Sequence, residues 1–290
     1  MYGICKTPLF LFVGIVLAKN KCKGVNEMKK RIVSIQAKVE LSDYQKNRQH
    51  MVNLLNEAKE KYQPDIILLP ETWNVGFFPQ NVSELADDVQ INASASLISD
   101  WAKTNQTNIV AGSIAIKENG VVKNRAMIFN RAGDLVHAYD KIHLFSPGNE
   151  DEYFEHGNSI ATFELDGVTC GIIICYDLRF PELTRKIALD GAQLLFVPAE
   201  WPFPRVAHWE TLSRARAIEN QMFVVTSNGV GTAGELRFCG HSGIYNPSGD
   251  ILAKAEDQET MIYAEINLEE VNEIRSKIPV FRDRKPELYN

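Results

Sequence analysis

The chain has 290 residues, of which 45% are hydrophobic and 23% are charged. This is an ordinary globular composition, and it excludes a disordered chain, a collagen-like repeat and a coiled coil. Lys and Arg number 31 against 37 Asp and Glu, so the formal net charge is −6 and there is no basic excess for nucleic-acid binding. The five Cys are too few for a disulfide scaffold, and their odd number leaves at least one thiol unpaired.

Residues 1–27 differ from the rest of the chain. The apolar run 8–18, PLFLFVGIVLA, is shorter than the roughly 20 residues that span a bilayer, and no small-residue cleavage pattern follows it. Met28 then opens MKKRIVSIQ, as in a cytoplasmic protein. We interpret 1–27 as an N-terminal extension: an upstream mis-start, a membrane anchor or a weak export signal. Membrane association is expected only if the segment is a real anchor.

Strands and helices alternate along residues 28–290, which we interpret as one domain. A buried strand is expected over 31–37, a helix over 42–62 that ends at Pro64, and a continuous apolar strand over 65–70. Further strands are expected over 108–116, 121–130, 135–139, 160–165, 168–174, 192–198, 221–228, 242–246, 251–255 and 261–266, and further helices over 94–103, 181–189, 206–220 and 268–276. The pattern indicates an α/β fold, and its hairpins indicate mixed sheets.

Three ionisable residues follow predicted strands, where α/β proteins place their crevices. The strand 65–70 leads to Glu71, the strand 168–174 leads to Cys175, and Lys141 comes just after another strand. Singly, these residues are typical of a loop carboxylate, a small buried hydrophobe and a surface charge. Together they fit a nucleophilic thiol with its base and a cation for developing negative charge. Backbone N–H groups at such a turn are expected to lower the thiol pKa.

The segments that carry these residues resemble a known family. LPETWNVGFFP, YDKIHLF and GIIICYDLRFPEL are similar to the Glu, Lys and Cys motifs of the nitrilase superfamily of carbon–nitrogen hydrolases, and they occur in the family's order. AEWPFPRVAHWETLSRARAIENQ, GHSGIYNPSGDIL and IPVFRDRKPELY are similar to later family segments. The resemblance implies a four-layer α-β-β-α sandwich with two mixed sheets and a homodimer that pairs through helices near the nucleophile. It also implies that neither a metal nor an organic cofactor is required.

Roles for the site residues follow from the same resemblance. It implies that Glu71 is the general base, Lys141 the transition-state cation and Cys175 the nucleophile. The family often has a second, structurally necessary glutamate, which we place at Glu150. Glu152 is the rival position, because the intervening SPGN departs from the family pattern.

The expected reaction is cofactor-free hydrolysis of a small amide. Cys175 attacks the amide carbon while Glu71 takes its proton, ammonia leaves, and water activated by Glu71 cleaves the thioester. Lys141 and the backbone N–H of Tyr176 are expected to hold the oxyanion.

The substrate expectation rests on CYDLRFPE and AEWPFPRVAHW, which resemble the ω-amidase branch acting on 2-oxo-dicarboxylic acid monoamides such as 2-oxoglutaramate. Arg179 is a candidate clamp for the substrate carboxylate; alternatively, it pairs with Asp177 or Glu182 and supports the turn. Trp201 is a candidate for the pocket wall, or else fills the core or an interface. An N-carbamoyl or aliphatic amidase is the alternative within the family.

Other function classes have weaker support. Residues 229–234 match G-x-G-x-x-G, but GELRFCGHSG is a poor helix, so a nicotinamide-binding oxidoreductase is disfavoured and a loop is expected. A non-catalytic interaction module would have lost a catalytic residue, and none is lost. Cys170 and Cys175, on opposite faces of one predicted strand, are not expected to share a metal or a disulfide.

Overall fold

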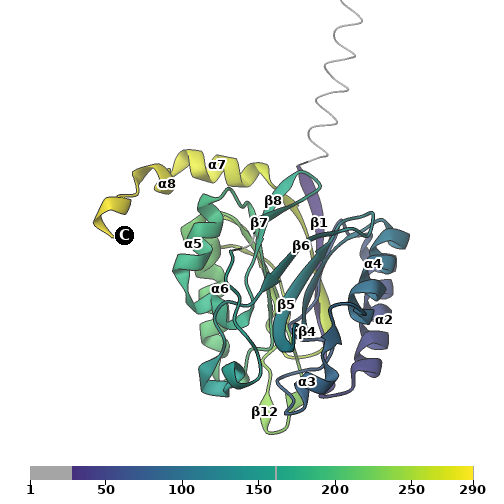
Figure 1. The fold of residues 1–290 in the computed structure, drawn as a ribbon. Coiled ribbons are helices and arrows are strands. Elements are labelled where there is room, and N and C mark those ends of the chain that lie inside the picture. Colours follow the sequence, from purple (N-terminus) through teal and green to yellow (C-terminus); the bar gives the residue numbers. More distant parts are fainter. Residues whose placement is uncertain (1–27, 161, 290) are drawn as a thin grey trace, which may run out of the picture.

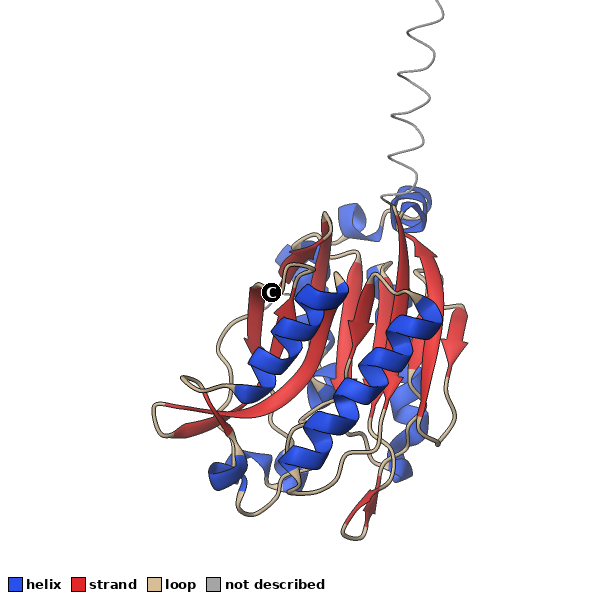
Figure 2. Ribbon diagram, turned by 90° about the vertical axis from the view of Figure 1, so that its right-hand side faces the viewer, coloured by secondary structure: helices blue, strands red, loops and turns tan. Residues whose placement is uncertain are grey.

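The computed structural model describes residues 28–160 and 162–289. The N-terminal extension expected over 1–27 lies outside these residues. Two large sheets pack face to face, and helices cover their outer faces (Figure 1; Figure 2). None of the helices in the described ranges is long and apolar enough to cross a membrane.

The first large sheet has seven strands, with parallel strands at its centre. They are β1 (Lys29–Gln36), β2 (Ile66–Leu68), β3 (Asp87–Asp88), β4 (Asn108–Glu118), β5 (Val121–Phe129), β6 (Leu135–Asp140) and β15 (Thr260–Asn267). The order is β15-β1-β2-β4-β5-β6, and β3 pairs with β4 alone. The neighbours β1, β2 and β4 are parallel, whereas β15, β5 and β6 are antiparallel to the strands beside them, so the sheet is mixed.

The second large sheet has six strands and is built in the same way. They are β7 (Thr162–Leu165), β8 (Val168–Ile172), β9 (Leu194–Ala199), β10 (Phe223–Asn228), β13 (Gly243–Tyr245) and β14 (Ile251–Lys254), in the order β14-β13-β10-β9-β8-β7. The neighbours β8, β9 and β10 are parallel, and β7, β13 and β14 are antiparallel to the strands beside them. The two sheets are linked by the Ser34 hydroxyl, which donates to the Thr226 carbonyl at 2.8 Å.

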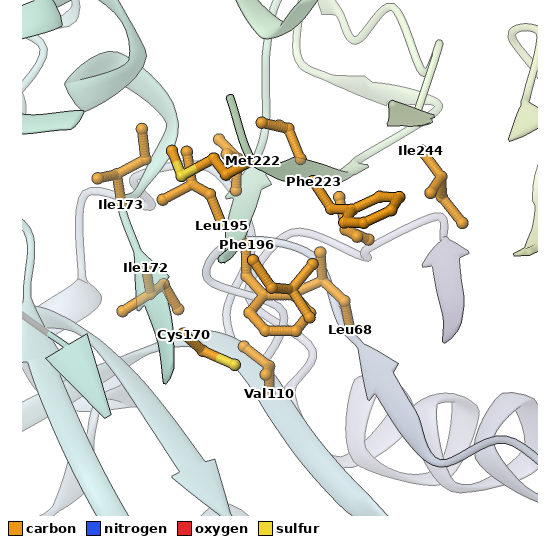
Figure 3. Packing of buried hydrophobic residues seen from close by; sticks show 14 of the residues in the cluster. Leu68, Val110, Cys170, Ile172, Ile173, Leu195, Phe196, Met222, Phe223 and Ile244 are labelled. Atoms are coloured by element: carbon orange, nitrogen blue, oxygen red, sulfur yellow. The ribbon is translucent and has the colours of Figure 1, made fainter. Parts of the chain in front are cut away.

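The main hydrophobic core lies between the sheets. In β2, Ile66 and Leu68 belong to this core, while Ile67 belongs to the cluster on the other face of the sheet. This alternation is the period-two pattern of a strand, and because both faces are covered the strand is apolar throughout. Leu68 and Val110 of the first sheet face Phe196 of the second sheet in Figure 3.

Helices form the two outer layers. The first sheet packs against α2 (Tyr44–Tyr62) and α4 (Ala93–Asn105), and the second against α5 (Pro181–Leu189) and α6 (Val206–Asn220). Asp43 caps α2, since its carboxylate accepts from the backbone N–H of Lys46. These layers confirm the α-β-β-α sandwich that the family resemblance implies.

The structure adds short elements that the sequence does not predict and shortens several predicted strands, among them the strand before Cys175. The additions include α3 (Val82–Leu85), β3, β11 (Thr232–Ala233), β12 (Leu236–Arg237) and α8 (Val280–Asp283), while α7 (Glu269–Lys277) lies close to its predicted position. The strand expected over 168–174 ends at Ile172. It ends early because the chain turns into a 3-10 segment, η3 (Cys175–Arg179), that begins at Cys175.

Candidate active site

Four segments that are distant in sequence bring their side chains to one buried place. Glu71 comes three residues after β2, Lys141 directly follows β6, and Cys175 begins η3 just beyond β8. Glu150 begins the short 3-10 segment η2 (Glu150–Glu152). Glu71, Glu150 and Lys141 are at most 1% exposed, and Cys175 is 8% exposed. The structure therefore brings together the three residues that the sequence analysis singles out, together with Glu150.

Lys141 lies between two carboxylates. Its Nζ donates to Oε1 of Glu71 at 2.9 Å and to both oxygens of Glu150, at 2.9 and 2.7 Å. Burial alone would lower the pKa of Lys141, but the charges of Glu150 and Glu71 raise it well above its usual value. The residue is therefore held as a cation. Glu152, the rival for the second glutamate, is exposed, so it is Glu150 that meets Lys141.

Glu71 is oriented by three hydrogen-bond donors. Oε1 accepts from Lys141 and from Nδ2 of Asn124, which lies on β5, at 2.9 Å each. Oε2 accepts from the backbone N–H of Glu200, just after β9, at 2.8 Å. These contacts fix the carboxylate between the two sheets. Such fixed orientation is what a general base needs.

The segment just before Glu71 lies very close to strand β4. Gly112 on β4 has φ +56°, and a Cβ there would lie 1.8 Å from the carbonyl oxygen of Pro70. The pairing of β4 with β5 is irregular between Val110 and Ser113, which is the position of this glycine. Only glycine allows the segment before Glu71 to approach β4 this closely.

Cys175 lies on a sharp turn with an unusual backbone conformation. Its φ is +45°, which is uncommon for a residue with a side chain. The buried Asp177 carboxylate stabilises the turn, since it accepts from the backbone N–H of Ile174 at 2.9 Å, from the Tyr139 hydroxyl at 2.8 Å and from His143. Strain of this kind, held by surrounding contacts, is typical of functional sites.

The thiol pKa does not follow the sequence-based expectation. Burial raises the pKa of Cys175 well above its ordinary value, and the charge of Glu71 and its hydrogen bond with the thiol raise it further. Lys141 acts in the opposite direction without outweighing them. The expectation of a lowered pKa was wrong because it considered only the turn amides and omitted desolvation and the carboxylate. The resting thiol is protonated, so a base must remove its proton.

A cavity opens beside Cys175 and Lys141. Its other lining residues are Phe77, Phe78, Phe145, Tyr176, Arg179, Glu200, Trp201, Pro202 and Arg205. The guanidinium of Arg179 lies 4.7 Å from the centre of the Trp201 ring, and its Nη2 is 3.3 Å from Nδ1 of His208. The alternative pairing of Arg179 with Asp177 or Glu182 is absent from the ion pairs of the described residues. Arg179, Trp201 and Tyr176 thus all border the same cavity as the nucleophile.

The sequence analysis missed two polar residues of this site. Asn124 donates from Nδ2 to both Glu71 and Glu150, at 2.9 and 3.1 Å. Glu200 is 1% exposed, accepts from the Thr72 hydroxyl at 2.8 Å, and borders the cavity. Burial and the charge of Glu71 raise the pKa of Glu200 well above its usual value, which favours its neutral form. Glu200 could have been predicted from its position, because it follows a predicted apolar strand just as Glu71 does.

The other sequence features take no part in this site. Residues 229–240, all of which the structure describes, contain the small hairpin of β11 and β12 instead of the helix that a dinucleotide site needs. Cys170 is buried on β8, and Cys175 lies beyond the end of that strand, so the two are not on one strand as predicted. Across 28–160 and 162–289, no group of three or more His, Cys, Asp or Glu side chains is arranged to hold a metal ion.

Residues 31–276 match the family model of carbon–nitrogen hydrolases, and the chain belongs to this family. It is 43% identical over 231 residues to a 2-oxoglutaramate amidase of Bacillus subtilis (strain 168), covering 80% of this chain and 89% of that relative. It is 36% identical over 233 residues to the omega-amidase NIT2 of Homo sapiens, covering 77% and 84%.

Solved structures of the superfamily have the same fold. A carbon–nitrogen hydrolase of Helicobacter pylori G27 superposes with a TM-score of 0.84 at 26% identity, covering 91% of this chain and 98% of that chain. A CN-hydrolase superfamily protein of Xanthomonas campestris superposes with a TM-score of 0.82 at 30% identity, covering 89% and 97%. The family and the fold implied by the sequence motifs are thus confirmed.

Proposed function

We propose that this hydrolase is an amidase that releases ammonia from a small linear amide carrying a carboxylate, a 2-oxo-dicarboxylic acid monoamide such as 2-oxoglutaramate. The observation that carries the proposal is the meeting of Glu71, Lys141 and Cys175 beside one cavity that Arg179 also lines. The names of the Bacillus and human relatives support the substrate class.

In the proposed mechanism the proton moves between sulfur, carboxylate and leaving group. Glu71 accepts the thiol proton as Cys175 attacks the amide carbon, because the protonated resting thiol is a weak nucleophile. The C–N bond then breaks, Glu71 returns the proton to nitrogen, and ammonia leaves. Glu71 next takes a proton from water as the water oxygen attacks the thioester carbon. The C–S bond breaks, Glu71 returns the proton to sulfur, and the carboxylic acid and the Cys175 thiol are freed.

The oxyanion of each tetrahedral intermediate needs a positive partner. Lys141 is a buried cation that borders the cavity, and the backbone N–H of Tyr176 is the proposed second donor. Glu150 keeps the lysine in place without entering the reaction. No step of this route calls for a metal or an organic cofactor.

A substrate panel read out by ammonia release tests the proposal. The wild-type protein is assayed with 2-oxoglutaramate, with glutaramate, with the neutral pentanamide and with an N-carbamoyl amino acid. We expect the highest kcat/KM for 2-oxoglutaramate and a much lower value for pentanamide, because the neutral amide has no group for Arg179 to bind. Preference for pentanamide or for the N-carbamoyl compound would replace the substrate assignment by one of the alternatives.

We further propose a homodimer. Its support is a set of exposed apolar side chains on the outer layer of the second sheet and in the C-terminal segment: Leu189, Ile218, Ile278 and Leu288. A cytoplasmic location is proposed from the sequence at Met28 alone. The intact mass of the native protein tests whether translation starts there.

A further inference from the structure

A second guanidinium borders the cavity. Arg205 lines it together with Arg179, Trp201 and Cys175, and the centre of its guanidinium lies 5.5 Å from the centre of the Phe145 ring. It is half-buried, and neither Arg205 nor Arg179 has an Asp or Glu partner among the ion pairs of the described residues. In contrast, Lys141, which also lines the cavity, is paired with two carboxylates.

Trp201 contacts both arginine residues, Arg179 through its guanidinium and Arg205 through its backbone. One face of its indole is covered by Arg179 at 4.7 Å, and its Nε1 donates to the backbone carbonyl of Arg205 at 2.9 Å. The backbone N–H of Arg205 donates to the carbonyl of Pro202 at 3.1 Å, so a tight turn fixes the start of this side chain. The Arg179 guanidinium thus lies against Trp201 and that of Arg205 against Phe145, and such contacts with aromatic rings reduce the side-chain entropy that is lost when a ligand binds.

The charge of this end of the cavity favours an anion. Among the described residues that line the cavity, Glu200 is the single acidic one. Its carboxyl is held by Thr72, and its raised pKa favours the neutral form. Arg179 and Arg205 then line the same cavity, and neither guanidinium has an acidic partner among the described residues. A guanidinium presents planar pairs of donors that match carboxylate oxygens.

We infer that Arg205 is a specificity-determining residue that, with Arg179, binds the carboxylate-bearing end of the substrate while Cys175 attacks the amide end. This inference rests on the proposed function and extends it, because it assigns the distal end of the substrate to two cations instead of one.

The test compares Arg205→Met and Arg205→Lys with wild type on an anionic and a neutral substrate of equal chain length, glutaramate and pentanamide. We expect Arg205→Met to raise KM for glutaramate by about 10- to 100-fold, the range for a lost charged hydrogen bond, with a smaller change in kcat. KM for pentanamide should stay within about twofold of the wild-type value, because the substitution leaves the contacts to the neutral carbon chain of the substrate unchanged. For Arg205→Lys we expect a KM for glutaramate between those of wild type and Arg205→Met, because lysine keeps the positive charge but loses the paired donors of the guanidinium.

A matched control is Arg237→Met. This arginine also stacks on an aromatic ring close to this segment, Phe203 at 4.4 Å, but it pairs with Asp257 and does not line the cavity. Unchanged kinetics are expected. Thermal unfolding of each variant separates a folding defect from a binding defect, and Arg205→Lys serves as the test if Arg205→Met does not fold.

The outcomes separate the inference from the function it rests on. Wild type that hydrolyses glutaramate no better than pentanamide contradicts the proposed substrate class. Wild type that prefers glutaramate, with folded Arg205 variants keeping the same KM for it, overturns the inference alone. An equal loss of activity on both substrates also overturns it, because Arg205 would then stabilise the site without distinguishing a charged substrate from a neutral one.

Discussion

At the scale of single residues, Lys141 and Glu150 form the best-connected part of the site. Both oxygens of the Glu150 carboxylate accept from Lys141, and they also accept from Asn124 and from the backbone N–H of Phe145. Three donors thus point at one buried group. An amide in its place would turn one acceptor into a donor that faces other donors.

Glu150→Gln is therefore expected to lower both stability and activity. Disruption of a fully buried ion pair typically costs about 3–5 kcal/mol, and displacement of Lys141 is expected to reduce kcat at least about 100-fold. Glu152→Gln is the control, because Glu152 is exposed and its substitution should change neither quantity measurably. Denaturant unfolding and ammonia release measure the two effects. Equal behaviour of the two variants would argue against Glu150 as the second glutamate.

The thiol of Cys175 gives a prediction about pH. Since burial and the Glu71 carboxylate raise its pKa, alkylation by iodoacetamide should reach half its maximal rate above about pH 8.5, the ordinary value for a thiol. Removing the negative charge in Glu71→Gln should move this midpoint downward, although hydrolysis is lost. Peptide mapping after labelling assigns the rate to Cys175. A midpoint that is lower in wild type than in Glu71→Gln would show that Glu71 does not raise the pKa.

The sequence was informative about some residues of the site and silent about others. Glu71, Lys141 and Cys175 are visible because each follows a predicted strand, apolar for Glu71 and Cys175, and each lies in a motif with several matched neighbours. The role of Asn124 could not be predicted. Its partners Glu71 and Glu150 lie on other segments, and nothing in the sequence around Asn124 indicates that they contact it. The direction of the thiol pKa likewise depends on burial, which spacing alone does not reveal.

At the scale of elements, the irregular part of β4 around Gly112 fixes the position of the backbone before Glu71. Gly112→Ala would put a Cβ 1.8 Å from the Pro70 carbonyl, so the backbone before Glu71 must move. We expect a loss of more than about 3 kcal/mol of stability, as for other severe overpacking, and a fall in kcat.

Gly120→Ala is the matched control for that substitution. Gly120 lies at the turn between β4 and β5 and also has positive φ, +88°, but a Cβ there would meet no atom within 4 Å beyond its chain neighbours. Its substitution should cost about 1 kcal/mol from backbone strain alone and leave kcat unchanged. Chemical denaturation and steady-state kinetics on both variants test the difference. Similar losses of stability in the two variants would mean that the protein relieves the crowding at Gly112 without moving the active site.

Most long elements were predictable from pattern, whereas the ends of several strands were not. The helices α5 and α6 have the predicted bounds, because a proline opens the first and the second is a long run without Gly or Pro. The strand before Cys175 was predicted too long, since its apolar residues continue to Ile174 while the backbone already turns. The hairpin of β11 and β12 is too short to leave a periodic signal.

At the scale of the whole molecule, the exposed apolar surface of the second sheet's helix layer is the basis for the proposed dimer. Ile218 on α6 is 48% exposed. A glutamate there would have to lose its hydration on association, so Ile218→Glu should shift the protein toward monomer. Light scattering after size exclusion, at several protein concentrations, measures the shift.

Ile91→Glu is the control for the dimer. Ile91 is 81% exposed and directly precedes Asn92, the cap of the first-sheet helix α4, so its substitution should leave the oligomeric state unchanged. A wild-type monomer at all concentrations would contradict the homodimer. A dimer unaffected by Ile218→Glu would place the contact elsewhere.

The layered architecture as a whole was predictable only in part from periodicity. Alternating helices and buried strands indicate an α/β fold with mixed sheets, but they do not say that two sheets face each other. That arrangement came from the family resemblance, and it depends on pairings between segments far apart in sequence, such as β1 with β15.

The central claim is that Cys175 is the nucleophile of a hydrolytic site completed by Glu71 and Lys141. The most direct measurement is ammonia release from 2-oxoglutaramate by Cys175→Ala, set beside its thermal unfolding curve. The account predicts a loss of at least about 10³-fold, because the covalent route has no sulfur, together with unfolding as cooperative as in wild type. Ammonia release at the wild-type rate from this folded variant would contradict the account.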